Sequence, residues 1–412
     1  MSRAWRPLCA FCLAFLACRS GGEKHGAKPR PAAITATPAP TALPTTAPVA
    51  ATATDPSSAF VLAFTQFSES GAKFRGDNLI SNEGSYLEVA SELASRRGGV
   101  YLGVGPEQNF SYIALSRPEL AVIVDIRRDN ALLHLLYKAI FETAHDRTEF
   151  LCTLLTRKCT AEDAPAPAAT IDSILGRVGK APPDREGFES RHLALAERLR
   201  ARSELGLSDA DFAGIERLHR QFLDRGPGAR FEGEGPPGLG YPTLAELLRS
   251  RSSEGKLGSF LSNDALFRTV QDLERQDRVQ FVVGDFGQVG ALRRIAEDLR
   301  ARSLVLRTFY VSNVEQYLFR TKAWATWLEN LRAFPIDSET RLVRSYLASA
   351  RPHPVQREGE RTASFTTRLR TWLACEERKP SKDYFSAISR PECGNPRPHS
   401  DDSAAASRLS RR

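Results

Sequence analysis

The segment 99–130 restricts the possible folds of this chain more than any other part of the sequence. One apolar run ends in the turn Gly103-Val104-Gly105, and a second ends in Asp125, which follows Gly103 by 22 residues. Between the two runs, Pro106 marks a position where a helix can begin, because the first N–H group of a helix needs no partner. This order of strand, glycine turn, helix, strand and acid is typical of a βαβ unit that binds a nucleotide.

A second block of alternating strands and helices follows residue 264. Its apolar runs at 279–283 and 304–311 end before Asp285-Phe286 and before Ser312-Asn313. Strands that are almost continuously apolar are buried on both faces, so we predict an α/β fold with a Rossmann-like, doubly wound, mostly parallel sheet. Ligands bind such sheets beyond the carboxyl ends of the strands, where these residues would meet the glycine turn and Asp125.

Composition divides the chain into four parts. Residues 1–18 have the composition of a signal peptide, 19–57 form an Ala/Thr/Pro-rich disordered linker, 58–350 form the Rossmann-like domain, and 351–412 form a basic, partly disordered tail. A long helical insertion is expected at about 146–262, and a further helix at 361–375. The tail supplies most of the net charge of +8, with 13 Lys/Arg against 8 Asp/Glu. Because no basic stripe with interleaved aromatic residues accompanies this charge, we expect no nucleic-acid site.

The first residues have the pattern of a bacterial lipoprotein signal. Arg3 and Arg6 precede an apolar run at 8–17, which is too short to span a membrane permanently. The run ends in Phe-Leu-Ala before Cys18, and this resembles signals in which a small residue precedes a lipidated cysteine. Residues 31–54 contain 21 Ala, Thr or Pro among 24, a composition that forms an extended tether. We therefore expect a protein of the cell envelope, held to a membrane by lipid on Cys18 and facing away from the cytoplasm.

Four cysteines remain beyond the signal, namely Cys152, Cys159, Cys375 and Cys393. An even number of cysteines in an exported chain indicates disulfides, and four cysteines allow three pairings. We favour the local pairing, Cys152 with Cys159 and Cys375 with Cys393. A metal site is not expected, because the chain beyond residue 18 has no CxxC or HExxH motif and its His residues are scattered.

The order of the expected strand ends resembles that of class I S-adenosylmethionine-dependent methyltransferases, over about 85–145 and 264–350. In that family a glycine loop passes the methionine part of the cofactor, and an acid at the end of the second strand binds the ribose hydroxyls. The resemblance implies that Gly103 and Gly105 form this loop and that Asp125 binds the ribose.

The later strand ends correspond to the adenine and substrate sides of such a site. The resemblance implies that Asp285 and Phe286 contact the adenine and that Ser312 and Asn313 face the substrate. Polar contacts to the amino group of the cofactor could come from Glu107, or from an upstream residue such as Asn78, Asn82 or Glu83.

These observations leave two functions open. The first is a membrane-anchored lipoprotein whose domain binds S-adenosylmethionine or a related adenosyl ligand and, if active, transfers a methyl group mainly by proximity. The second is a non-catalytic binding or scaffold lipoprotein of the cell envelope on a degenerate Rossmann-like fold. A hydrolase is disfavoured because no GxSxG motif occurs, and the sequence identifies no protein partner. In a helix expected at 130–144, His134, Lys138 and Glu142 form a polar stripe, and we expect His134 to be a solvated surface residue rather than a functional base.

Overall fold

The computed structural model describes residues 55–74, 76, 78–159, 169–233, 240–347 and 351–397. By its contacts the chain separates into Met1–Val49 and Ala50–Arg412, and every described residue belongs to the second unit. The expected signal, Cys18 and the tether at 31–54 therefore lie outside the described residues. The linker ends slightly earlier than expected, because α1 (Pro56–Leu62) begins within it and is capped by Asp55. None of the described helices is both long and apolar enough to cross a membrane.

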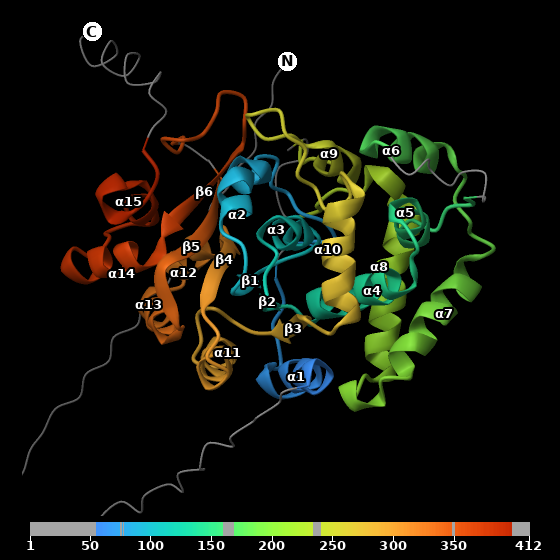
Figure 1. Cartoon of the computed structure of the whole chain (residues 1–412), viewed down its shortest axis with the longest axis horizontal. Coiled ribbons are helices and arrows are strands. Elements are labelled where there is room, and N and C mark those ends of the chain that lie inside the picture. Colours follow the sequence, from blue (N-terminus) through green and yellow to red (C-terminus); the bar gives the residue numbers. More distant parts are fainter. Residues whose placement is uncertain are drawn as a thin grey trace, which may run out of the picture. The chain divides into compact units, whose positions relative to one another are not determined.

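A six-stranded sheet forms the centre of the second unit (Figure 1). Its strands are β1 (Val100–Gly103), β2 (Leu120–Asp125), β3 (Val279–Val283), β4 (Leu306–Ser312), β5 (Ile336–Leu347) and β6 (Thr362–Arg368). They lie in the order β3-β2-β1-β4-β5-β6, and all neighbouring pairs are parallel except β5 with β6. The expected α/β fold with a Rossmann-like, mostly parallel sheet is confirmed.

The direction of chain travel along the sheet reverses at β1. Val100 is paired with Leu120 of β2 on one side and with Leu306 of β4 on the other. The chain moves from β1 to β2 and β3 in one direction, and then returns from β3 to β4 and β5 in the other. The carboxyl ends of β1 and β4 therefore form a topological switch point, which is where open α/β sheets usually bind ligands.

Helices cover both faces of the sheet because the crossovers run in two directions. Right-handed crossovers place the helices between β1, β2 and β3 on the face opposite to those between β3, β4 and β5. Within the first group α3 and α4 both contact α10, and within the second α11 contacts α13 (Figure 1). The bounds are α3 (Gln108–Ser116), α4 (Arg128–Thr143), α10 (Asp264–Arg275), α11 (Ala291–Ala301), α12 (Val314–Arg320) and α13 (Trp324–Ala333).

The insertion between β2 and β3 is helical, as the sequence predicts, and it packs on α4 (Figure 1). Its helices are α5 (Arg147–Leu154), α6 (Ile171–Lys180), α7 (Phe188–Arg200), α8 (Asp209–Arg225) and α9 (Leu244–Arg249). A disulfide joins Cys152 to Cys159, with their Cα atoms 6.2 Å apart. The face of α4 that carries His134 and Lys138 turns inward, where the His134 ring stacks on Phe281 of β3 and Lys138 pairs with Asp277, so both side chains are buried and the expected solvated stripe is wrong.

The C-terminal part is more ordered than the sequence suggested. Residues 362–368 are strand β6 rather than the first half of a helix, and β6 pairs antiparallel with β5. Two helices follow, α14 (Leu369–Arg378), which packs on β5, and α15 (Tyr384–Ser389). The second disulfide, between Cys375 and Cys393, ties this region together. The sheet therefore extends beyond the expected domain boundary at residue 350.

The N-terminal part of the unit runs beside β3 before it reaches β1. After α1, a short π-helix, η1 (Ala63–Phe67), packs on β3. The sequence predicts a helix over about 82–95, but regular structure begins later, as η2 (Tyr86–Val89) followed by α2 (Ala90–Ser95). The described residues between η1 and η2 form no helix or strand, and the first of them lie against the carboxyl ends of β2 and β3, where the candidate site is expected.

Candidate functional site

The two glycines of the turn after β1 have different surroundings: Gly103 is closely packed, whereas Gly105 borders open space. A Cβ on Gly103 would lie 1.9 Å from Asn109 Oδ1 and 2.7 Å from the Tyr101 hydroxyl, so the protein's own side chains require this glycine. Gly105 has a φ of +81°, and no described atom lies within 4 Å of the position its Cβ would take. A residue with a side chain is strained in this left-handed conformation, so the turn favours glycine for its backbone as well.

Two buried side chains hold the carbonyl of Gly105. It accepts hydrogen bonds from Asn109 Nδ2 at 3.0 Å and from His134 Nε2 at 2.9 Å. Since a carbonyl can only accept, Nε2 of His134 carries the proton and Nδ1 is an unprotonated acceptor. That Nδ1, and Oδ1 of Asn130 one turn earlier in α4, are buried without a hydrogen-bond partner among the described residues. Burial lowers the pKa of His134 to about 4, so the ring is neutral at physiological pH.

Asp125 lies at the end of β2, as expected, but its carboxylate is already bound. One oxygen accepts from the backbone N–H of Arg127 at 2.9 Å and from its Nε at 3.0 Å, and the other accepts from its Nη2 at 2.9 Å. Both side chains are buried. The ribose hydroxyls that Asp125 is expected to bind would therefore have to compete with a buried, bidentate arginine.

A stretch of the chain's own backbone covers the ends of β2 and β3. We call residues 67–72 the covering segment. The N–H of Glu69 donates to the carbonyl of Val283 at 2.8 Å, and the N–H of Ala72 donates to that of Ile126 at 2.8 Å. The Glu69 carboxylate accepts from the N–H groups of Asp285 at 3.0 Å and of Ala291 at 2.6 Å. The expected adenine side of the site is thus filled by this segment.

The two expected adenine contacts serve other purposes. Asp285 Oδ1 accepts from the N–H of Gly287 at 2.8 Å and so closes the turn after β3. The Phe286 ring is buried and stacks on Trp327, with centroids 5.4 Å apart and an angle of 8° between the rings. It also packs against Phe309 of β4, so Phe286 belongs to the core under α13 and does not face a ligand at the strand ends.

The end of β4 is joined to the chain upstream of β1. Ser312, which has a φ of +51°, donates a hydrogen bond to the buried carboxyl of Glu83. Glu83 also accepts from Gln108 Nε2 at 2.9 Å, and its burial raises its pKa. Asn313 is half-buried and precedes α12 without a capping bond from its side chain. Glu83 therefore connects β4 to α3 and is closed off from a substrate.

Of the other upstream candidates, Asn78 comes closest to a ligand-binding role. Its backbone is left-handed, with a φ of +42°, and its Oδ1 is buried without a partner among the described residues. Asn82 is half-buried.

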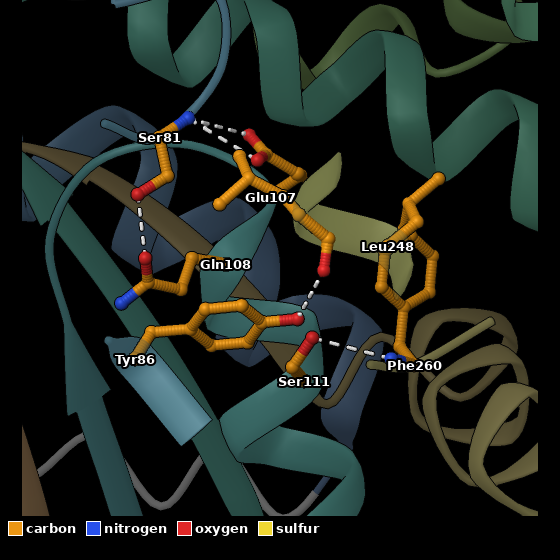
Figure 2. Close-up of a pocket in the computed structure, with 8 residues that line it drawn as sticks. Ser81, Tyr86, Glu107, Gln108, Ser111, Leu248 and Phe260 are labelled. Carbon is orange, nitrogen blue, oxygen red and sulfur yellow. Dashed lines mark hydrogen bonds between the residues drawn. The ribbon is translucent and has the colours of Figure 1, made fainter. Parts of the chain in front are cut away.

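Glu107 lines a small cavity beside the turn, and its carboxylate is directed at the backbone of Ser81 (Figure 2). Its two carboxylate oxygens accept from the N–H of Ser81 at 3.1 and 3.2 Å, and burial raises its pKa to about 7. The cavity measures about 10 Å³, close to the least volume that can hold one water molecule. It is lined by Ser81, Tyr86, Glu107, Gln108, Ser111, Leu247, Leu248 and Phe260. This space suits a water molecule and is far too small for a nucleotide.

The structure therefore brings the predicted residues to one edge of the sheet but joins most of their side chains to each other or to neighbouring segments. Sequence reasoning missed two residues that close the site. Arg127 had a local signal, since an arginine two residues after the strand-end acid can fold back onto it. Glu69 had none, because it lies 216 residues from its partner Asp285.

The fold and this edge define a Rossmann-like α/β protein with a closed switch point. A family model described as "Domain of unknown function (DUF7790)" matches residues 79–166 and 242–390. The match covers more than half of the chain and all six strands, so the chain belongs to this family. Residues 167–241, between the matched segments, fall within the helical insertion. No curated protein matches the chain.

Proposed function

We propose that this chain is a lipid-anchored protein of the bacterial cell envelope that acts by binding partners and does not transfer methyl groups. The observation that carries the proposal is the buried bidentate pair of Asp125 with Arg127 at the position where a cofactor ribose would bind. The covering segment supports it, because it closes the ends of β2 and β3 through both its backbone and Glu69.

Rough magnitudes favour the closed state over a bound ribose. Separating a buried ion pair costs about 3–5 kcal/mol, because each charge is left without its partner in a poorly solvated place. Lifting the covering segment breaks further hydrogen bonds, each of which contributes about 1 kcal/mol. Two ribose hydroxyls bound to the freed carboxylate return about 1.5–3 kcal/mol each. The ligand therefore has no clear advantage over the groups that already fill the site.

The expected compartment also favours a binding role over methyl transfer. Disulfides persist in oxidising compartments, and the structure has one within the insertion and one beyond β6. S-adenosylmethionine is made in the cytoplasm, so an exported domain would meet little of it. A binding or scaffold role needs no such cofactor.

A second candidate function, the binding of an adenosyl ligand, is favoured by one specific observation. No described atom would meet a Cβ on Gly105, whose carbonyl accepts from His134 Nε2. Nδ1 of the same ring, and Oδ1 of Asn130 one turn earlier in α4, are buried without partners among the described residues. Unpaired buried polar atoms are costly, and a ligand that supplied hydrogen bonds would relieve that cost. If this candidate holds, the protein resembles the methyltransferases in ligand as well as in fold.

Titration calorimetry separates the two candidates. We expect no heat and no thermal shift when S-adenosylmethionine, or its demethylated product, is added at up to millimolar concentration to the chain. Asp125→Asn serves as the matched variant. Binding to the unaltered chain that this variant abolishes would replace the first candidate with the second.

The anchor is tested separately by metabolic labelling with a radioactive fatty acid, followed by fractionation. We expect label on the unaltered chain and none on Cys18→Ser. Equal labelling of the two chains, or recovery of the unaltered chain in the soluble fraction, would contradict the anchored part of the proposal.

A further inference from the structure

Exposed apolar and cationic side chains gather at the carboxyl edge of the sheet, beside the closed site. Three large apolar side chains are exposed among the described residues, and two of them, Val289 at 64% and Tyr317 at 38%, lie on loops or helices that follow strand ends there. The Phe74 ring, just beyond the covering segment, contacts the Tyr317 ring at 5.2 Å between centroids. The guanidinium of Arg320 lies 6.0 Å from the centre of the same ring.

The three segments that carry these residues touch each other. A Cβ on Gly287 would lie 2.8 Å from Cβ of Ala323 and 3.2 Å from Cδ2 of Leu318, so the loop that bears Val289 packs against the end of α12. Tyr317 and Arg320 belong to α12, and Lys322 follows it. We define the edge patch as Phe74, Val289, Tyr317, Arg320 and Lys322.

The charge of this surface is positive and unbalanced. Lys73, Arg320 and Lys322 are exposed, and none of them forms an ion pair within the described part of the chain. Two acids that follow the ends of β4 and β3 are engaged elsewhere. Glu315 is buried against Arg344, and Asp285 accepts from the N–H of Gly287.

We propose that the edge patch rests on the anionic lipid headgroups of the membrane to which the chain is anchored. Tyrosine rings favour the boundary between water and hydrocarbon, and clustered cations are attracted to anionic headgroups. A Lys or Arg near such a surface strengthens binding about fivefold. The proposal rests on the anchored part of the proposed function and adds which face of the domain meets the membrane.

The length of the tether permits this orientation. Residues 19–55 separate Cys18 from α1, and a Pro-rich chain of that length reaches about 115 Å when extended, at roughly 3.1 Å per residue. A domain of about 340 residues has a radius of gyration of about 20 Å. The anchor therefore lets any face of the domain approach the membrane, and the edge patch determines which face binds the headgroups.

Vesicle sedimentation of the unlipidated chain 19–412, which contains every described element, tests the proposal. We expect binding to vesicles of phosphatidylcholine with about one-third phosphatidylglycerol, weak binding to phosphatidylcholine alone, and loss of binding in high salt. The triple variant Tyr317→Ser, Arg320→Glu, Lys322→Glu should bind the anionic vesicles at least tenfold more weakly. The control variant Leu193→Ser, Lys382→Glu removes an exposed leucine and an exposed cation from other surfaces, and it should bind like the unaltered chain.

Two results would overturn the proposal. The first is no binding to anionic vesicles. The second is a loss of binding in the control variant in proportion to its charge change, two units against four in the triple variant, which would indicate net charge alone. Circular dichroism checks that the variants fold. If the triple variant does not, Val289→Ser replaces it, because that side chain is mostly in solvent, and it should weaken binding by about threefold or more. Because the chain 19–412 lacks Cys18, failure here leaves the labelling and ligand experiments of the proposed function unaffected.

Discussion

Replacing Arg127 with methionine tests whether the Asp125–Arg127 pair closes the candidate site. The substitution keeps an unbranched side chain of similar length. It removes the two guanidinium donors, Nε and Nη2, that reach Asp125, and it keeps the backbone N–H. The carboxylate then remains buried at the end of β2 without a counter-charge. We expect Arg127→Met to lower the free energy of unfolding by about 3–5 kcal/mol, the usual cost of an uncompensated buried charge.

A double-mutant cycle isolates the pair from everything else that Arg127 contacts. Asp125→Asn keeps the shape of the side chain and removes its charge, and the double variant Asp125→Asn, Arg127→Met removes the charge pair altogether. Because two groups in direct contact are coupled, the double variant should be less destabilised than the sum of the two single variants, by about 1–3 kcal/mol.

Urea unfolding followed by tryptophan fluorescence and by circular dichroism measures these free energies, and coincident transitions show that they are comparable. A coupling energy below about 0.5 kcal/mol would refute the inference that the Asp125–Arg127 ion pair holds the candidate site closed. Adenosyl ligand binding gained by Arg127→Met would show instead that the closure masks a site that still works.

Three further predictions concern the surroundings of the site. Gly103→Ala should destabilise more than Gly105→Ala, by about 2 kcal/mol or more against about 1, because only the first meets packed atoms while the second meets only backbone strain; equal losses in urea unfolding would contradict this. The raised pKa of Glu107, about 7 against 4.5, means that the folded state binds the proton more tightly, so this group should lower stability by up to about 3 kcal/mol as pH rises from about 4.5 to 7. Because the pKa values of Glu83 and Glu274 are also raised, Glu107→Gln should make the fall shallower by that amount and leave the rest; a pH profile identical to that of the unaltered chain would disprove the assignment. Replacing Cys152 and Cys159 by serine should cost about 2 kcal/mol, because the bridge closes a short loop, and insensitivity of the unaltered chain to reductant would argue against it.

The fold class could be predicted from the sequence because the sequence signals of its strands are local. The apolar runs before Gly103, Asp125 and Asp285 are each a few residues long and are bounded by turn residues, so each strand could be recognised from its own segment. The strand at 362–368 was missed, although its Thr-rich sequence has strand propensity, because the chain around it resembles a polar tail.

The candidate site could be predicted from the sequence only in part. The positions of Gly105 and Asp125 at the strand ends were predictable, since parallel strands bring their carboxyl ends to one edge of a sheet. What their side chains contact was not predictable, because Phe286 turns into the core under α13 and Glu69 reaches the site from far upstream. The burial of His134 was not predictable either, because this face of α4 turns toward β3 and α3, where the ring packs on Phe281 and Phe110.

The sequence alone was therefore enough to predict a mostly parallel α/β sheet with a glycine turn and an acid at neighbouring strand ends. Hydrophobic periodicity and turn residues are local signals, because each depends only on a few consecutive residues. The closure of this edge could be seen only in the folded protein. Closure depends on whether segments hundreds of residues apart, such as the covering segment and the turn after β3, meet in register, and no local pattern encodes that meeting.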